Sequence, residues 1–371
     1  MKFIVPKNII FKGLAHVQSI VEKKNTLPIL SNILIEAKDN NIVLSATDMD
    51  ISITEKIASN IVDSGSTTVN ATTFYEIIRK LPDSKEIEII SNDGKLLSIR
   101  SGSSRFSLGC LPREDFPIIE TENTGTNIKI ESHILLKLID KTKFAISNEE
   151  TRYFLNGLYF NIRKEAKSNC ITLVGTDGHR LSKVDYLNDN IPEENMGVII
   201  PKKTINELSK LLSEFTGEID INLSSNKIVF FINDSILISK LIDGNFPDYK
   251  RVIPIENKNI LKLNRGNFFQ AIDRVSTINS DKLPIVKLKL LNNIMNISTS
   301  NTDNGTATED IETDYQGDEI EIGFNSKYIL DMVNNLEDEE IILSFRDNSS
   351  PITATESSNP DLVYVLMPMR I

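Results

Sequence analysis

The sequence predicts an α+β fold made of three tandem copies of one domain, each copy itself doubled. The first observation is a Thr-Asp turn between apolar runs, which occurs at Asp48 and Asp177 and in a looser form at Asp303. These aspartates are 129 and 126 residues apart, a spacing that fits repeated domains and is too long for a solenoid repeat. The second observation is a closing pair, Phe-Pro at residues 116–117 and 246–247 and Met-Pro at residues 367–368. We therefore expect domains over residues 1–125, 126–254 and 255–371.

The first copy shows how each half is built. Apolar residues at helical spacing predict a helix over residues 8–24, and the Leu-Pro step at residues 27–28 then stops it and opens a strand. Strands follow at residues 32–36 and 42–45, joined by a polar turn at residues 38–41, and at residues 51–54. The second half begins with a helix over residues 72–81, ended by Pro82. Its strands are expected at residues 86–90, 96–100 and 105–108.

The same order returns in the other two copies. Helices are expected over residues 132–146 and 202–212 in the middle copy, and over residues 265–278 and 326–336 in the last. The middle copy should have strands at residues 155–161, 170–174, 180–185, 220–223, 227–232 and 236–241. Asn70, Pro201 and Asn325 each precede a leucine by 11 positions, so the registers of the second helices agree. Helices alternating with hairpin-connected strands predict antiparallel sheets.

Composition narrows the class of protein. Hydrophobic residues make up 40% and charged residues 25% of the chain, which is typical of a globular protein. The start of the chain does not resemble a signal peptide, and no apolar run is long enough to span a membrane, so we expect a cytoplasmic protein. Cys110 and Cys170 are far apart in sequence, which argues against a disulfide framework. The net charge of −11 argues against a protein that reads nucleic-acid sequence.

The charge is segregated along the chain. The six expected helices together carry +8, so the remaining residues carry −19. Lysine favours exposed helix faces in any protein, but acidic residues favour them equally. Helix propensity alone therefore does not explain why the helices of an acidic chain carry a net positive charge. We therefore predict a helix-lined surface that faces a polyanion.

Three motifs resemble those of a known family. Thr176-Asp-Gly-His-Arg-Leu181, Phe246-Pro-Asp-Tyr-Lys-Arg-Val252 and Tyr364-Val-Leu-Met-Pro-Met-Arg370 are similar to signatures of the bacterial DNA polymerase III beta subunit, the sliding clamp. The length and the triplication fit as well; Ser182 and Ile371 are small departures. The resemblance implies a head-to-tail homodimer that closes into a ring around double-stranded DNA, without sequence specificity. Its implied partners are the replicative polymerase alpha subunit, the clamp loader and other proteins with a clamp-binding motif, with no membrane partner, cofactor, metal or catalytic residue.

The resemblance also implies a peptide-binding cleft. Its residues would be Leu155, Thr176, Gly178, His179, Arg180, Leu181, Pro247, Arg251, Val252, Ser350, Val365, Met367, Pro368, Met369 and Arg370. Val365, Met367 and Met369 alternate, which predicts one strand face. The competing interpretation is the ordinary core of a terminal strand, but methionine suits a surface that accepts several partners.

Further positions follow from the same resemblance. Lys24, Asn148, Arg152 and Tyr153 would lie near DNA, although Lys24 could simply complement the helix dipole. Phe106 and Ile278 would lie at the dimer interface, with buried core as the alternative. Pairing of strands between subunits would cover two exposed sheet edges.

Two other functions compete with that of a sliding clamp. An enzyme could use Asp177 and His179 as orienter and base, but no nucleophile in a recognisable setting and no phosphate loop accompanies them. A monomeric scaffold without a DNA role is the third possibility. Its mass in solution would be that of one chain.

Overall fold

The computed structural model describes residues 1–22, 26–83, 86–119, 125–164, 168–279, 284–301 and 305–370. Its contacts group into two compact units, which we call unit 1 (Met1–Leu136 with Lys203–Leu241) and unit 2 (Lys137–Lys202 with Ile242–Ile371). The described residues contain no helix both long and apolar enough to cross a membrane.

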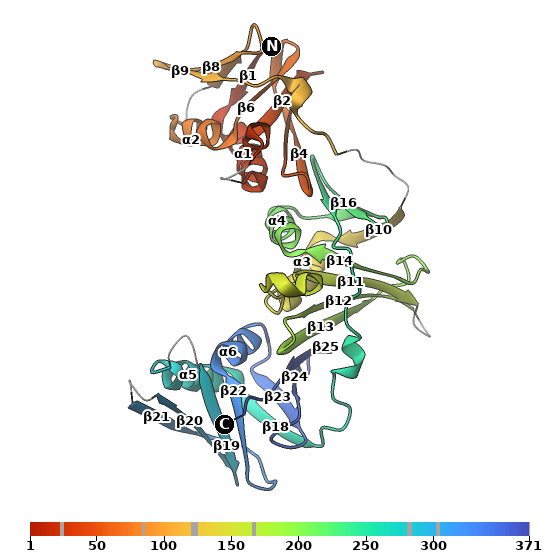
Figure 1. The fold of residues 1–371 in the computed structure, drawn as a ribbon, viewed down its shortest axis with the longest axis vertical. Coiled ribbons are helices and arrows are strands. Elements are labelled where there is room, and N and C mark those ends of the chain that lie inside the picture. The colour runs from red at the N-terminus through yellow and green to blue at the C-terminus, as the bar shows by residue number, and fades with distance from the viewer. Residues whose placement is uncertain are drawn as a thin grey trace. The chain divides into compact units, whose positions relative to one another are not determined.

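Unit 1 contains two antiparallel sheets with helices packed on them (Figure 1). The five-stranded sheet has the order β5-β1-β7-β8-β9, and the eight-stranded sheet has the order β10-β15-β16-β17-β4-β3-β2-β6. The helices are α1 (Lys7–Ile20), α2 (Ala71–Lys80) and α4 (Lys202–Ser213, from Lys203 on), with the 3-10 helices η1 (Pro28–Ser31) and η2 (Arg113–Asp115). The strands are β1 (Lys2–Pro6), β2 (Asn32–Lys38), β3 (Asn41–Thr47), β4 (Ile51–Ala58), β5 (Asn60–Asp63), β6 (Gly65–Asn70), β7 (Glu86–Ile90), β8 (Leu96–Ser101), β9 (Ser104–Gly109), β10 (Thr126–Glu131), β15 (Glu218–Leu223), β16 (Lys227–Ile232) and β17 (Ser235–Lys240).

Unit 2 has the same plan. Its eight-stranded sheet has the order β14-β11-β12-β13-β25-β24-β23-β18, and its four-stranded sheet has the order β21-β20-β19-β22. The helices are α3 (Ser132–Lys143, from Lys137 on), α5 (Arg265–Ser276) and α6 (Ser326–Asn334), with the 3-10 helices η3 (Glu150–Leu155) and η4 (Tyr249–Arg251). The strands are β11 (Gly157–Lys164), β12 (Asn169–Thr176), β13 (Arg180–Leu187), β14 (Met196–Pro201), β18 (Asn259–Asn264), β19 (Ile285–Leu291), β20 (Ile294–Asn301), β21 (Gly305–Glu312), β22 (Ile320–Asn325), β23 (Glu340–Phe345), β24 (Ile352–Glu356) and β25 (Asn359–Leu366).

The cores lie between sheets and helices. Phe3, Phe74 and Leu14 are fully buried in unit 1, and Phe268, Phe324 and Tyr364 are buried in unit 2. Each of these side chains comes from a residue pattern of the expected period, because one face of each helix and alternate residues of each strand point inward.

The expected six helices are all present, but most are shorter at the carboxyl end. The first helix ends at Ile20, since Val21 already has extended backbone angles. Asn70, Asn264 and Asn325 cap their helices by accepting a backbone N–H with the side-chain oxygen. Such caps fix where a helix begins, which explains why starts were predicted better than ends.

Other expected elements were wrong or incomplete. The strand expected after the Leu-Pro step is the 3-10 helix η1, because proline sets the first turn of a helix as readily as it ends one. The short strands that precede each first helix, β1, β10 and β18, were missed. The turn at Asp39 and Asn40 is confirmed, since both residues have positive φ, at 52° and 62°. Asp303 lies outside the described residues.

The repeated plan is confirmed by the registers of the sheets. Each eight-stranded sheet contains strands of two successive copies, joined at one strand pair. In unit 1 this pair is β4 with β17, where Ser52 lies opposite Ile238. In unit 2 it is β13 with β25, where Leu181 lies opposite Val365 (Figure 1). We call these two strand pairs the seams. When positions are counted through the paired strands from the start of each helix, Ser52 corresponds to Leu181 and Ile238 corresponds to Val365. Both seams therefore have the same register.

Candidate functional site

The turn between β12 and β13 is held by its own side chains. Asp177 Oδ1 accepts the backbone N–H groups of His179 and Arg180, at 2.9 and 3.0 Å. Thr176 Oγ1 donates to the carbonyl of Arg180 at 2.6 Å and accepts the N–H of Gly178 at 3.1 Å. Asp48 makes the same two bonds in the first copy, at 2.9 and 2.8 Å. The repeated Thr-Asp pair is therefore a structural requirement of this turn.

Gly178 fills the one position of this turn that favours glycine. Its φ is 86°, and a Cβ there would lie 2.6 Å from Nη1 of Arg152. The equivalent residue in the first copy, Met49, also has a positive φ, of 80°. Backbone geometry alone therefore permits a larger residue at a cost, and the approach of Arg152 is what makes the second turn more restrictive.

Arg180 is fixed within unit 2. Its guanidinium lies between the rings of Phe144 and Tyr328, at 5.3 and 4.4 Å from their centroids. It also pairs with Asp177 at 3.1 Å and with Asp331 at 2.5 Å. Because only 11% of the side chain is exposed, these contacts act at short range with little water between them. Arg180 therefore anchors the turn to α6 and to Phe144, the residue that follows α3.

An apolar cavity of about 100 Å³ lies beside this turn, and we call it the cleft. Its lining residues are Leu155, Thr176, Gly178, Arg180, Leu181, Pro247, Tyr249, Val252, Val365 and Met367. Beneath it, Val174, Leu181, Tyr249 and Val365 form a buried cluster, with Phe246 stacked on Tyr159 at 4.7 Å between ring centroids. Apolar walls with a few polar groups are typical of a site that takes an apolar side chain from a ligand.

A second, wider cavity of about 530 Å³ adjoins the cleft, and we call it the side groove. It shares Val252 and Met367 with the cleft and is also lined by Arg251 and Ser350, both expected at the cleft itself. Ser350 Oγ is held by Arg346 at 2.6 Å and by Asp347 at 2.8 Å. Hydrogen bonds from Arg346, Ser349 and Ser350 hold the pKa of Asp347 in this loop well below its ordinary value.

Four expected cleft residues line neither cavity. They are His179, Pro368, Met369 and Arg370. The backbone explains this for Met369: β25 ends at Leu366, and the N–H of Met369 donates to Gly323 at 2.8 Å. The strand face expected for these three residues therefore ends at Val365; Met367 lines the cleft from beyond the end of β25, and Met369 does not line it. The carbonyl of His179 accepts the N–H of Met367 at 2.9 Å, so His179 positions the methionine through its backbone while its side chain stays exposed.

The enzymatic alternative finds no support in the turn. Asp177 is occupied by two backbone N–H groups and by Arg180, and its contact with His179 is to the main chain, not to the ring. In the described residues, no set of three or more His, Cys, Asp or Glu side chains is placed to hold a metal ion.

The residues expected near DNA lie together, with one exception. Arg152 and Tyr153 belong to η3, and Asn148 lies just before it. Tyr153 is 56% exposed, Arg152 pairs with Glu149 at 2.6 Å, and Asn148 accepts a hydrogen bond from Lys202 at 2.6 Å. Lys24 lies outside the described residues.

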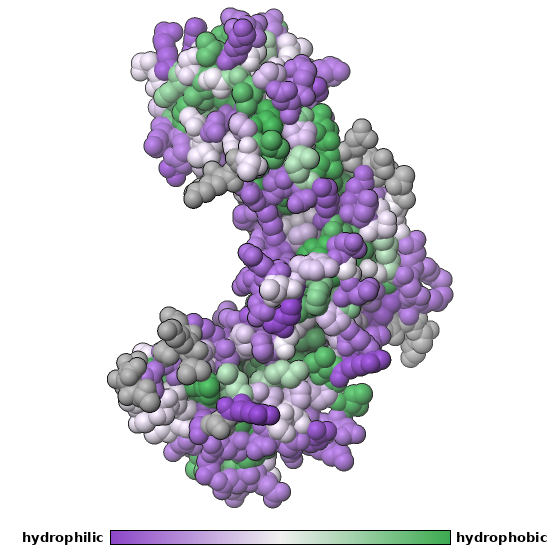
Figure 2. Space-filling model, viewed as in Figure 1, coloured by the Kyte–Doolittle hydropathy of each residue, from purple (hydrophilic) through white to green (hydrophobic). Residues whose placement is uncertain are grey.

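The helices keep an excess of basic residues, and hydrophilic residues cover the outward face of α4 (Figure 2). Several of these cations have acidic neighbours: Lys12 lies 3.1 Å from Glu214, and Lys210 lies 2.7 Å from Glu207. These acidic neighbours therefore offset part of the positive charge that the helices carry.

Of the two residues expected at the dimer interface, one lies on the edge strand of a sheet and the other just beyond the end of a helix. Phe106 is on β9, an edge strand, and is 38% exposed, so within this chain it is not core. Ile278 is half-buried in the turn after α5.

Three residues important to the site were not expected from the sequence. Tyr249 lines the cleft, and Phe144 and Tyr328 enclose Arg180. Tyr249 follows Pro247 by two residues within the motif of residues 246–252, so a local sequence signal marks its position. Phe144 follows directly after α3 and Tyr328 lies on α6, so no local pattern predicts that the two rings meet at Arg180.

Comparison with known proteins places the chain. Models of the N-terminal, central and C-terminal domains of the DNA polymerase III beta subunit match residues 1–120, 129–248 and 250–370. The curated beta sliding clamps of Caulobacter vibrioides and Rickettsia felis are 41% and 37% identical to it, each over the full length of both chains. A sliding clamp from Bartonella birtlesii, solved with griselimycin bound, has a TM-score of 0.96 at 42% identity, and one from Pseudomonas aeruginosa, also with griselimycin, has 0.94 at 32%; both are covered fully. The chain belongs to the DNA polymerase III beta subunit family, the bacterial beta sliding clamps.

Proposed function

We propose that this chain is a DNA polymerase processivity factor whose homodimer forms a ring that slides on duplex DNA. The observation that carries the proposal is the apolar cleft beside the Thr176–Leu181 turn, in a chain that belongs over its whole length to a polymerase-subunit family. The family is not catalytic, and the role is tethering. The ring would hold the replicative polymerase alpha subunit, the clamp loader and other motif-bearing proteins on DNA.

The cleft and the side groove together suit an extended peptide. Because they share Val252 and Met367, a peptide could place one apolar side chain in the cleft while its neighbours follow the side groove past Arg251 and Ser350. Its backbone carbonyls or a carboxylate would be complementary to Lys250, Arg251 and Arg346. Griselimycin, which the relatives bind, is a suitable probe.

The cleft assignment is tested by substituting one methionine. Met367→Gln should weaken griselimycin binding at least tenfold, because a buried amide would lose its water without gaining partners. Met49→Gln is the matched control, since Met49 is 43% exposed and lies at the equivalent turn of the first copy. Equal binding by the wild type and Met367→Gln, measured by calorimetry, would remove the cleft from the proposal.

The dimer proposal is supported by two edge strands with no strand on their outer side among the described residues, β9 and β21. Both seams pair the last strand of one copy's first half with the last strand of a neighbouring copy's second half. The strands that remain for a third seam are β21, which ends the first half of the third copy, and β9, which ends the second half of the first copy. If a third seam between two chains has the same register, Ser107 lies opposite Thr306 and Phe106 opposite Ala307. Acidic residues Glu309, Asp310 and Glu312 on β21 would then approach Arg100 and Arg105.

Sedimentation tests the third seam. Phe106→Arg should shift the particle from twice the chain mass of 41.7 kDa toward the single chain at micromolar concentration. Val62→Arg is the control, because Val62 is 52% exposed on β5, the opposite edge of the same sheet. A wild-type protein sedimenting as one chain would favour the monomeric scaffold.

The proposed DNA contact is weak and independent of sequence. Basic helices and the η3 residues Asn148, Arg152 and Tyr153 would meet phosphates, with Lys24 as a further candidate. Retention on closed circular DNA and loss after linearisation is the expected result, since a ring leaves DNA only at an end. Equal retention on both forms would contradict it.

We also propose the domain boundaries near residues 125 and 254 and a cytoplasmic location. The boundaries are supported by the residues that the three family models match, and the location by the function in DNA replication that the family name implies.

A further inference from the structure

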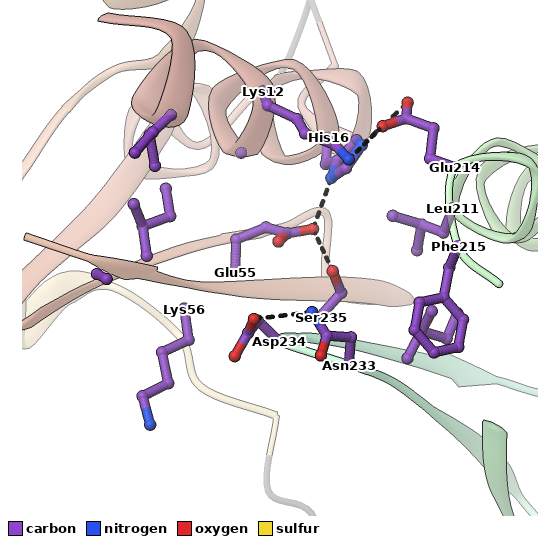
Figure 3. Close-up of a pocket in the computed structure, with 15 residues that line it drawn as sticks. Lys12, His16, Glu55, Lys56, Leu211, Glu214, Phe215, Asn233, Asp234 and Ser235 are labelled. Atoms are coloured by element: carbon purple, nitrogen blue, oxygen red, sulfur yellow. Dashed lines mark hydrogen bonds and ion pairs between the residues drawn. The ribbon is translucent and has the colours of Figure 1, made fainter. Parts of the chain in front are cut away.

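His16 lies in a charged cluster in unit 1 that the proposed function does not use. It is the tenth residue of α1, and 10% of its side chain is exposed. Its Nδ1 lies 2.7 Å from Oε1 of Glu55 on β4, and its Nε2 lies 3.3 Å from Oε1 of Glu214, just after α4 (Figure 3). Glu55 belongs to the N-terminal family domain and Glu214 to the central one, so the imidazole bridges two domains.

The geometry sets the protonation of this imidazole. An ionised carboxylate can only accept hydrogen bonds, and a neutral imidazole has only one N–H to donate. With both nitrogens facing carboxylate oxygens, a neutral ring would direct a lone pair at one of them. Glu55 is itself 5% exposed and already accepts from Ser235 at 2.7 Å, so it needs a cation close by. The doubly protonated imidazolium donates a hydrogen bond to Glu55 and places its positive charge 3.3 Å from Glu214, where the contact is an ion pair and not a hydrogen bond.

Other charged groups face the same cavity of about 340 Å³. They are Lys12 on α1, Lys56 on β4, Glu214 after α4 and Asp234 before β17. Glu207 of α4 does not line the cavity but accepts a hydrogen bond from Ser19 of α1. Lys12 pairs with the other oxygen of Glu214, at 3.1 Å (Figure 3). Loss of the proton from His16 would therefore leave Glu214 paired with Lys12 alone, so that one of its two charged contacts with α1 is lost.

The equivalent positions in the other copies support the importance of this cation. The tenth residues of α3 and α5 are Lys141 and Arg274. Lys141 lies 2.9 Å from Glu337, and Arg274 lies 2.5 Å from Glu309, which occupies on β21 the place of Glu55 on β4. Each copy thus has a cation at this point of its first helix. Of the three, only the imidazole loses its charge near neutral pH.

We propose that His16 is a protonated clasp between the N-terminal and central domains, and that loss of its proton loosens α1 from the end of α4. Burial alone would lower the pKa of His16, but the hydrogen bonds and charges of Glu55 and Glu214 outweigh it and raise the pKa above the ordinary 6.5. The clasp is then complete below this ordinary value and is lost as the pH rises through the higher, folded one.

Hydrogen exchange of the full-length protein tests the clasp. Amide exchange in α1 and at the end of α4 is measured by mass spectrometry at about pH 6 and about pH 8, after correction for intrinsic exchange. The wild type should lose protection there by roughly threefold to tenfold at the higher pH, as expected for one lost charge-assisted contact. His16→Gln should show the lower protection at both pH values.

Controls separate the clasp from a general effect of pH. Glu214→Gln should reduce the pH dependence, and the protein should still fold because the side chain of Glu214 is 43% exposed. Glu218→Gln, an exposed residue paired with Lys129, should keep it. Wild-type protection that does not change with pH, or an unchanged pH dependence in either Glu214→Gln or a folded His16→Gln, overturns the proposal.

Discussion

Removing Asp177 should test whether its turn shapes the cleft or merely stabilises the fold. Asp177→Ala removes the acceptor of two backbone N–H groups, at 2.9 and 3.0 Å, and one partner of Arg180. Hydrogen bonds to a charged acceptor contribute about 1.5–3 kcal/mol each, and the lower part of this range applies because His179 lies at the surface and water can replace the lost acceptor. For the two bonds together we therefore expect the free energy of unfolding to fall by about 3 kcal/mol, as measured by urea denaturation.

The matched variant is Asp48→Ala. Asp48 accepts two N–H groups in the same way and pairs with Lys203, so the loss of stability should be similar. Only the turn at Asp177 lines the cleft, however. If the ordered turn is populated about one tenth of the time in Asp177→Ala, griselimycin affinity falls about tenfold, whereas Asp48→Ala binds as the wild type does. Equal affinity in all three proteins, or equal loss in both variants, would refute the link between turn and cleft.

Three further results are expected. Gly178→Ala should lower the melting temperature more than Gly94→Ala, because both have positive φ but only Gly178 has a neighbouring group within 4 Å of the added Cβ; equal shifts would mean that backbone strain alone acts. Although burial raises the pKa of Asp185, its hydrogen bond to Lys183 contributes to a net lowering below 3.8, so its stabilisation is present above about pH 4 and is lost as the pH falls through the folded value. Asp185→Asn should accordingly flatten the decline of stability in acid, and an unchanged acid limb would contradict this. Asn325→Ala should cost about 1 kcal/mol in thermal or urea unfolding by removing the cap of α6, and a cost near zero would show that the helix start is held by packing.

The sequence predicted the repeated plan because its signals are local. Apolar spacing, the Thr-Asp turns and the asparagine caps each act over a few residues, so all of them can be recognised in the sequence alone. The helix ends were predicted less well, since nothing at Val21 marks a stop as clearly as Pro82 does for α2.

The site was less predictable than the fold. Nine residues of the cleft lining were expected by resemblance, but the position of Met369 depends on where β25 ends and on its bond to Gly323, which no motif encodes. Arg180 contacts Phe144, which lies 36 residues before it, and Tyr328, which lies 148 residues after it. Contacts of this kind arise only when the chain is folded.

The two seams have the same backbone register but different side chains. One seam places Ser52 opposite Ile238, and the other places Leu181 opposite Val365. Main-chain groups supply the recurring geometry, and they are the same in every residue but proline. Side chains along such a boundary are therefore free to diverge during evolution, so one boundary can acquire a binding surface and another a titratable group without disturbing how neighbouring copies join.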